Sequence, residues 1–319
     1  MALTNMQVYN DEIMTSTIET VDQMVDNIAG SSRGAINLAS VGNQGDFTKE
    51  SFWANLSTAQ RRVDRYASNA SVSAVALAQA ELVGVKVAGG FGPVILEPGQ
   101  LTWLQEDPQA AIAAIATYFA AAMIQDQLNT GISSAVAAID NVAALVNDVT
   151  TAKISQSAIN GSHAKFGDMS QSLVADIMTG STYHKLVDLG LANGEQLFQA
   201  GNVTIVNILG KAVVITDSPA LTDAVPTPDQ DLVLSLVSGG LIVESNNDTL
   251  TNIETTNGNQ RIETTFQADY SFNVKLKGYA WDVTNGGSSP TDAELATGSN
   301  WDQVTLNKHT AGTLAKGDI

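Results

Sequence analysis

Cysteine is absent from the 319 residues of this sequence, so disulfides and thiolate metal sites are excluded. Basic side chains are scarce as well, because 15 lysines and arginines face 33 acidic residues and leave a formal net charge of −18. Nucleic-acid binding requires basic groups that displace counterions from phosphates, and anionic membranes attract basic segments. The composition favours neither partner, although solubility alone would also explain the acidity.

Charge of either sign is low, at 15% of residues where roughly a quarter is usual. Interface cores are depleted in charged residues, so one interpretation is a surface largely buried against other subunits. The alternative is a monomer surface covered by serine, threonine, asparagine and glutamine. Composition alone leaves both interpretations open.

No apolar run is long enough to span a bilayer, which needs about 20 residues. The most apolar stretch, Ala110–Ile124, is shorter and leads into Gln125 and Asp126. Residues 1–10 lack the basic segment and apolar run of a secretory signal. We therefore expect a soluble protein made in the cytoplasm, with no membrane partner.

Catalytic and ligand-binding motifs are also missing. His163, His184 and His309 lie far apart without the spacing of a metal site or a triad, and we expect ordinary surface or loop histidines. Glu106–Asp107 is explained by helix capping. Asp229–Asp231 could bind a cation, but it lacks the spacing of a calcium loop and is expected to be solvated. The sequence therefore predicts no enzyme and no cofactor.

Residues 1–50 predict an N-terminal arm. Ser16 and Glu19 have the spacing of a capping box, apolar residues follow at helical spacing, and Gly30 is placed to end the helix. One amphipathic helix between polar, glycine-rich segments cannot form a core by itself. It needs a partner surface on its own chain or on a neighbour.

Residues 51–104 predict a long two-stranded excursion. Phe52 and Trp53 begin a predicted short helix, and apolar strands then flank a turn predicted at Gly89–Pro93. A two-stranded ribbon is marginal in water, so this excursion also needs a partner surface.

Residues 105–149 hold the strongest local signal, a long helix. Asp107 can cap it, Pro108 suits its first position, and apolar residues recur every three or four positions as far as Leu145. Gly131 is the weak point. A continuous helix of about 40 residues would be about 60 Å long, more than a compact domain needs.

The remaining chain predicts a mixed α/β unit, then strands, then a tail. The tail has a single tryptophan, Trp301, and is expected to have little core of its own. Asn257–Gly258 is a hairpin signal between threonine-rich strands. The predicted parts are helices at 170–179 and 183–189, strands at 203–208 and 212–216 around Gly210, an apolar piece at 231–237, a strand at 241–244, a long strand at 261–281, and the tail at 283–319.

Three of the five arginines, Arg61, Arg62 and Arg65, fall within five residues. They could pair with their own carboxylates, such as Asp64, on one helix face. Alternatively they could clamp a neighbour's acidic surface, because the planar guanidinium suits carboxylates. A nucleic-acid patch is the weakest of the three interpretations, because no further basic residues flank the cluster.

The order of these parts resembles the HK97-like major capsid proteins of tailed bacteriophages. Short segments of the sequence also resemble those of phage coat proteins. They lie at 45–53 and 59–64, at 85–93, and at 166–168, 176–178 and 183–186 leading into 209–217. The resemblance implies an α+β fold with these parts: an N-terminal arm at 1–50, an E-loop region at 51–104, a P-domain spine helix at 105–149, an A-domain at 150–240, P-domain return strands at 241–285, and a C-terminal tail at 286–319.

The resemblance also implies a function. Copies would assemble as hexamers and pentamers of an icosahedral shell around double-stranded DNA that is not bound specifically. Scaffolding, portal and decoration proteins would be further partners. The expected inter-subunit contacts are Trp53, Lys86, Phe91 and the three clustered arginines. Some family members cross-link a loop lysine to an asparagine, and Lys86 is the only lysine at 51–104, but no such chemistry is assigned here.

Two other classes stay open. An encapsulin, a bacterial nanocompartment, has the same fold and differs in its contents, which are cargo enzyme and not genomic DNA. A secreted surface protein would fit the acidity and the missing cysteine, but the expected export signal is absent.

Overall fold

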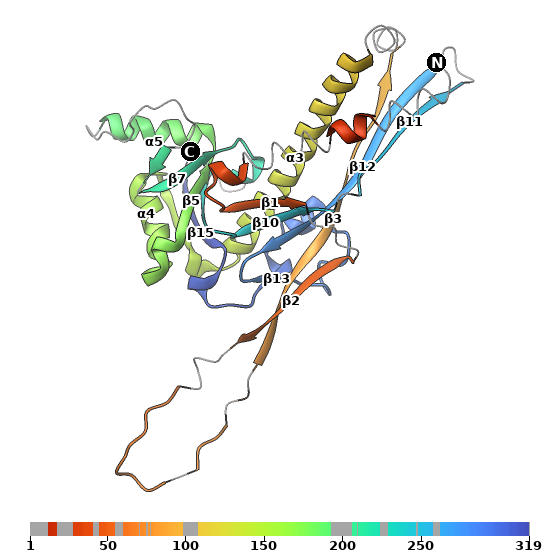
Figure 1. The fold of residues 1–319 in the computed structure, drawn as a ribbon. Helices are drawn as coiled ribbons and strands as arrows, with labels where there is room; N and C mark the ends of the chain where they lie inside the picture. The colour runs from red at the N-terminus through yellow and green to blue at the C-terminus, as the bar shows by residue number, and fades with distance from the viewer. Residues whose placement is uncertain are drawn as a thin grey trace.

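A computed structural model describes residues 12–17, 28–40, 45–54, 60–69, 71–74, 76, 78–97, 108–192, 206–208, 210–223, 229–246, 248–257 and 262–318. Two sheets and a long helix form the body, with a two-stranded ribbon extending from one end and a three-stranded one from the other (Figure 1). Side chains from both sheets and the helix share one main apolar core.

The first sheet is built around two long strands. Within the described residues it has six strands, ordered β1(Ile36–Ser40), β10(Leu241–Ser245), β12(Glu263–Leu276), β3(Ala78–Leu96) and β2(Phe47–Ala54), with β11(Leu250–Thr256) beside β12. Only β1 and β10 run parallel. Val83, Val85 and Val87 are buried at the period of two that a half-buried strand requires.

The second sheet is covered on both faces. Its seven described strands are ordered β4(Val146–Lys153), β15(Gly312–Asp318), β9(Gln230–Val237), β5(Leu173–Met178), β7(Lys211–Ile215) and β6(Val206–Ile208), with β8(Thr222–Asp223) beside β9. Leu232 and Leu234 of β9 join the main core, whereas Val233 packs with α4(Gln156–Ala164) and α5(Gly180–Ala192). Burial on both faces accounts for β9, in which every residue is buried.

The long helix is α3(Pro108–Asp140), 33 residues in length. Gly131 lies inside this helix at a position where β10 packs so closely that a side chain would have little room. A Cβ atom there would lie 3.0 Å from Val243 Cγ2 and 3.1 Å from Leu241 Cδ2. The predicted continuation to residue 149 is wrong, because a 3₁₀ turn, η2(Ala143–Leu145), leads into β4.

The turn predicted at Gly89–Pro93 is wrong. These residues lie inside β3, a single strand of 19 residues. Gly89 pairs with Tyr270 of β12, and a Cβ atom on Gly89 would lie 2.6 Å from Tyr270 Cε2. The absence of a side chain at Gly89 therefore leaves room for the Tyr270 ring, and close approach of a neighbouring group is a known reason for glycine in a strand. The short helix predicted at Phe52–Trp53 is also wrong, since both residues lie in β2.

The prediction that the C-terminal tail has little core is wrong as well. Trp301 and Trp281 are both buried, with ring centroids 4.9 Å apart at 70°, and Trp301 Nε1 donates to the Leu295 carbonyl at 3.0 Å. Strand β15 lies inside the second sheet, between β4 and β9. Gly312 suits that position because a Cβ atom there would collide with the Ser235 carbonyl.

Several local predictions are confirmed and one more is wrong. Helix α5 covers the predicted 183–189, and β6 and β7 pair antiparallel around Gly210, whose φ is +80°. The helix predicted at 170–179 is instead a 3₁₀ turn and β5, because that segment pairs with β7 and β9. Strands β11 and β12 pair antiparallel as expected, whereas Gly258 of the predicted turn lies outside the described residues.

The arm is described in two helical pieces, 12–17 and 28–31, and the predicted helix between them lies outside the described residues. The remaining short elements are η3(Gly167–Ser172), η4(Pro219–Leu221), β13(Tyr279–Trp281), α6(Asp292–Leu295), η5(Gly298–Asn300), β14(Trp301–Gln303) and η6(Asn307–His309).

Candidate assembly surfaces

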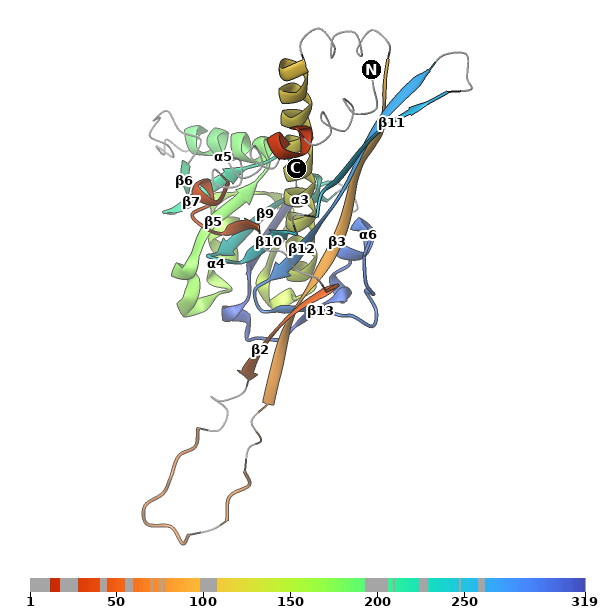
Figure 2. The same ribbon diagram turned by 45° about the vertical axis from the view of Figure 1, so that its right-hand side comes forward.

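The described residues between β2 and β3 project away from the body. We call its described part, residues 60–69, 71–74 and 76, the projecting segment; all of these residues are exposed (Figures 1 and 2). It carries large apolar side chains: Tyr66 is 99% exposed, Val63 66% and Val72 59%. Covering exposed apolar side chains of this size with another molecule would be favourable.

Arg61, Arg62 and Arg65 lie on the projecting segment. They are exposed and do not lie on a helix, so the predicted pairing along a helix face is wrong. Asp64, their expected partner, accepts a hydrogen bond from the Tyr66 backbone N–H at 2.9 Å. The arginines are thus presented to solvent together with the apolar side chains.

The other candidate contacts lie elsewhere. Lys86 is half-buried in β3, opposite Asn273 of β12, and so does not lie at a loop tip. The Phe91 ring packs 5.4 Å from Phe119 and 6.3 Å from Phe266, within the chain's own aromatic cluster. Trp53 pairs with Gln79 in the β2–β3 ladder, and its side chain lies outside the described residues. The structure therefore does not bring these residues together with the arginines.

An apolar hollow of about 170 Å³ lies beside that aromatic cluster. Tyr118 and Val94 belong to its lining and are 76% and 39% exposed. The full lining is Ile13, Phe91, Val94, Ile115, Tyr118, Phe119, Ile253 and Phe266. No local pattern in the sequence pointed to this hollow, because its residues come from five separate stretches of the chain.

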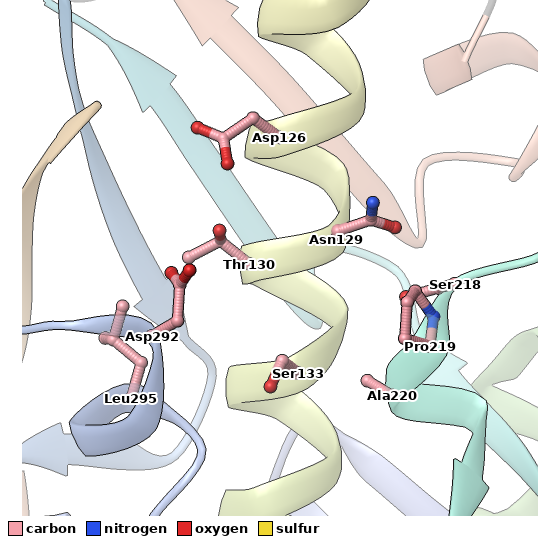
Figure 3. A pocket seen from close by; sticks show the side chains of 9 residues that line it. All are labelled: Asp126, Asn129, Thr130, Ser133, Ser218, Pro219, Ala220, Asp292 and Leu295. Carbon is pink, nitrogen blue, oxygen red and sulfur yellow. The ribbon is translucent and has the colours of Figure 1, made fainter. Parts of the chain in front are cut away.

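A second hollow, of about 450 Å³, lies over the middle of α3, and we call it the acidic groove. Its floor is one face of α3, one wall is α6, and the other is Ser218 with η4 (Figure 3). The lining residues are Asp126, Asn129, Thr130, Ser133, Ser218, Pro219, Ala220, Asp292 and Leu295. In the sequence, the only feature that drew attention to any of these residues was the position of Asp126 just after an apolar stretch.

Asp126 is the half-buried carboxylate of the groove. It accepts a hydrogen bond from the Tyr270 hydroxyl at 2.7 Å. Burial raises the pKa of Asp126, and the nearby Asp292 charge acts in the same direction, whereas the Tyr270 hydrogen bond opposes them. Burial thus disfavours the charged form of the Asp126 carboxyl, and Asp292 brings a second acidic side chain to the same groove.

A buried polar cluster lies between α4 and the second sheet. His163 Nε2 is 2.9 Å from Asp176 Oδ1 and 3.0 Å from Ser235 Oγ, and Ser235 donates to the same Asp176 oxygen at 2.6 Å. A catalytic triad needs serine and aspartate on opposite ring nitrogens, but both contact the same nitrogen here. The cluster therefore lacks triad geometry, and the expectation that His163 is a surface or loop histidine is wrong, because it is 5% exposed and lies on α4.

Asp231 also differs from its expected solvated state. It is 2% exposed and accepts a hydrogen bond from Lys185 Nζ at 2.6 Å. Across the described stretches, no three histidine, aspartate or glutamate side chains are grouped as a metal site. Among the helices described, none combines the length and apolarity that a membrane crossing requires.

The fold matches several solved structures over most of their length. A structure from Mycobacterium phage Cain aligns with a TM-score of 0.55 at 11% identity, covering 91% of this chain and 89% of that one. The Cyanophage Pam1 capsid asymmetric unit aligns at 0.52 and 10% identity, covering 88% and 87%. The holo-SrpI encapsulin complex from Synechococcus elongatus aligns at 0.51 and 9% identity, covering 88% and 84%.

The α+β architecture is thus the HK97-like capsid fold that the sequence resembled. Residues 5–314 match the family model described as Gp13-like, major capsid protein 13-like, and the chain belongs to that family. No sequence among the curated proteins matches significantly. The protein is a major capsid protein of a tailed bacteriophage, a structural component of the virion that associates with copies of itself.

Proposed function

We propose that this protein builds an icosahedral phage head by assembling into hexamers and pentamers around double-stranded DNA. The observation that carries the proposal is the projecting segment, whose apolar side chains reach 99% exposure at Tyr66. In water this exposure is unfavourable, and a neighbouring subunit would remove it.

Each part of the chain then takes a role in the shell. The residues before β1 form the N-terminal arm, and β2, the projecting segment and β3 form the E-loop, which lies over an adjacent subunit. The first sheet with α3 as spine forms the P-domain, and the second sheet with α4 and α5 forms the A-domain. The C-terminal residues contribute to both, through the Trp281–Trp301 pair and β15.

The charge balance fits a container. A net charge of −18 does not favour specific binding of the enclosed DNA. The role is structural and not enzymatic, which is consistent with a His163 cluster that lacks triad geometry. Scaffolding, portal and decoration proteins are the further partners we propose, with synthesis in the cytoplasm of the host bacterium.

Expression of the chain, alone and with its neighbouring genes, tests this proposal. Negative-stain electron microscopy should show closed icosahedral shells or rings of capsomer size. A well-behaved monomer under all assembly conditions would contradict the proposal.

The second candidate is an encapsulin-type compartment, favoured by the likeness to the SrpI encapsulin complex. Particle content separates the two functions. Nuclease-protected genomic DNA in particles from infected cells supports the phage head, whereas a co-purifying cargo enzyme without DNA supports the compartment.

A further inference from the structure

We propose that the acidic groove over α3 receives an arginine side chain from the projecting segment of a neighbouring copy. The inference rests on the proposed assembly and adds to it a specific receptor and a specific ligand. The ligand is the guanidinium of Arg61, Arg62 or Arg65, and the receptor contains Asp126, Asp292 and Ser218.

The groove has the size and the charge for this ligand. Its volume of about 450 Å³ accommodates a long side chain, and its two titratable lining residues are both acidic. Asp126 comes from the floor and Asp292 from the α6 wall, so their carboxylates approach the groove from different elements (Figure 3). A guanidinium carries five N–H donors in a planar fork, which suits two carboxylates better than a spherical ion does.

Ser218 is a further polar feature of the groove, independent of the two carboxylates. The residue is 2% exposed, and its hydroxyl has no hydrogen-bond partner within the described part of the chain. It lies just before η4 at the start of the turn, but its side chain does not cap that turn. In Figure 3 the Ser218 side chain lies in the wall that faces α3. Buried hydroxyls are normally paired, so an incoming donor would satisfy this one.

The half-buried state of Asp126 also favours a cationic ligand. Burial raises its pKa, which means that the free subunit disfavours the charged carboxylate. A guanidinium in the groove would reverse this effect, because an opposite charge nearby favours ionisation. The Tyr270 hydroxyl already donates to one carboxylate oxygen, and a carboxylate has a second oxygen that can accept from a further donor.

The ligand must come from another copy. The projecting segment extends away from the body beyond the ends of β2 and β3 in both views, whereas the groove lies over the middle of α3 (Figures 1 and 2). Three of the chain's five arginines are concentrated on that segment in a protein of net charge −18. A neighbour's acidic groove is therefore the complementary surface for the main cationic feature of this chain.

Cysteine cross-linking gives a direct test, because the natural chain contains no cysteine. Arg61→Cys, Arg62→Cys and Arg65→Cys are made separately and each is co-assembled with Asp292→Cys, then treated with a short bis-maleimide. The matched control replaces Asp292→Cys with Asp188→Cys, an exposed acidic position on α5. Each single variant is also assembled and treated alone, to measure cross-links between identical positions.

We expect at least one arginine position to give covalent dimers with Asp292→Cys about tenfold above the Asp188→Cys control. Dimers at the control level in normal shells would overturn the inference and leave the proposed assembly intact. Cross-links from the segment to a scaffolding protein, without dimers through position 292, would overturn it equally. Failure of every variant and of the natural chain to assemble would remove the proposed function together with the inference.

A charge exchange provides a second readout that does not depend on cross-linking. Asp292→Arg alone should raise the critical concentration for assembly about tenfold, because like charges then meet at the groove. Combining it with Arg61→Glu, Arg62→Glu or Arg65→Glu, at the position that cross-links, should return the critical concentration toward that of the natural chain. An unaltered critical concentration in the single variant, or no recovery in the combined one, would contradict the inference.

Discussion

Replacing Trp301 with alanine should destabilise the subunit strongly, although the residue lies in a segment whose composition predicted a tail. Trp301 is 1% exposed and packs against Trp281 with ring centroids 4.9 Å apart. Truncating a buried tryptophan to alanine costs about 3–5 kcal/mol. Its indole N–H also donates to the Leu295 carbonyl at 3.0 Å, and leaving that buried acceptor unpaired places the expected loss near ~5 kcal/mol.

The assay is urea denaturation of the unassembled subunit, followed by far-ultraviolet circular dichroism. Trp301→Phe keeps a ring against Trp281 and should lose less than the alanine variant. Leu306→Ala is the matched control, because Leu306 lies in the same segment and is 63% exposed, so its loss should stay within about 0.5 kcal/mol. A loss below about 1 kcal/mol for Trp301→Ala would refute the reasoning that the C-terminal residues complete the core.

Three further predictions concern the projecting segment, Gly312 and Asp126. Replacing residues 60–74 with a short Gly–Ser linker should leave the melting temperature of the subunit nearly unchanged but abolish shells in negative stain, whereas deleting 78–96 should unfold the body, because β3 lies within the first sheet. Gly312→Ala should cost about 1–3 kcal/mol in urea denaturation, because its Cβ atom would collide with the Ser235 carbonyl, while Gly30→Ala, with open space around it, should cost little. Asp126→Asn should raise subunit stability at pH 7 by less than about 1 kcal/mol, because the carboxyl is only half-buried. Its raised pKa means that stability is lost as pH rises from the ordinary 3.8 through the folded value, so melting curves of the two proteins should converge in acid.

Local periodicity predicted those elements whose burial follows from their own residues. The alanine-rich spacing of α3 and the apolar run of β9 both indicate their burial directly. The β11–β12 hairpin was also predictable, because its threonine-rich strands are adjacent in sequence. The HK97-like fold class followed from the order of these elements.

Other features depend on residues that are distant in sequence. From the sequence, Gly89 resembles a turn residue and Gly312 resembles part of a flexible tail. In the structure, Gly89 lies against Tyr270 and Gly312 lies against β9. His163 gave no sign of burial, because its partners Asp176 and Ser235 lie on β5 and β9. Tertiary packing decides the conformation at each of these positions.

The candidate surfaces divide in the same way. The arginine cluster at 61–65 is contiguous in sequence, so it could be identified directly. The acidic groove could not, because Asp126, Ser218 and Asp292 come from α3, the turn before η4, and α6. The hollow lined by Tyr118 and Phe91 was missed for the same reason.

The central claim is that a neighbouring copy covers the exposed apolar side chains of the projecting segment. A high-resolution cryo-electron microscopy map of the assembled particle tests this claim most directly. The account predicts density for residues 60–74 against an adjacent subunit, with Tyr66 buried between the two chains. Density that places this segment against its own body, or that leaves Tyr66 in solvent within a closed shell, would contradict the account.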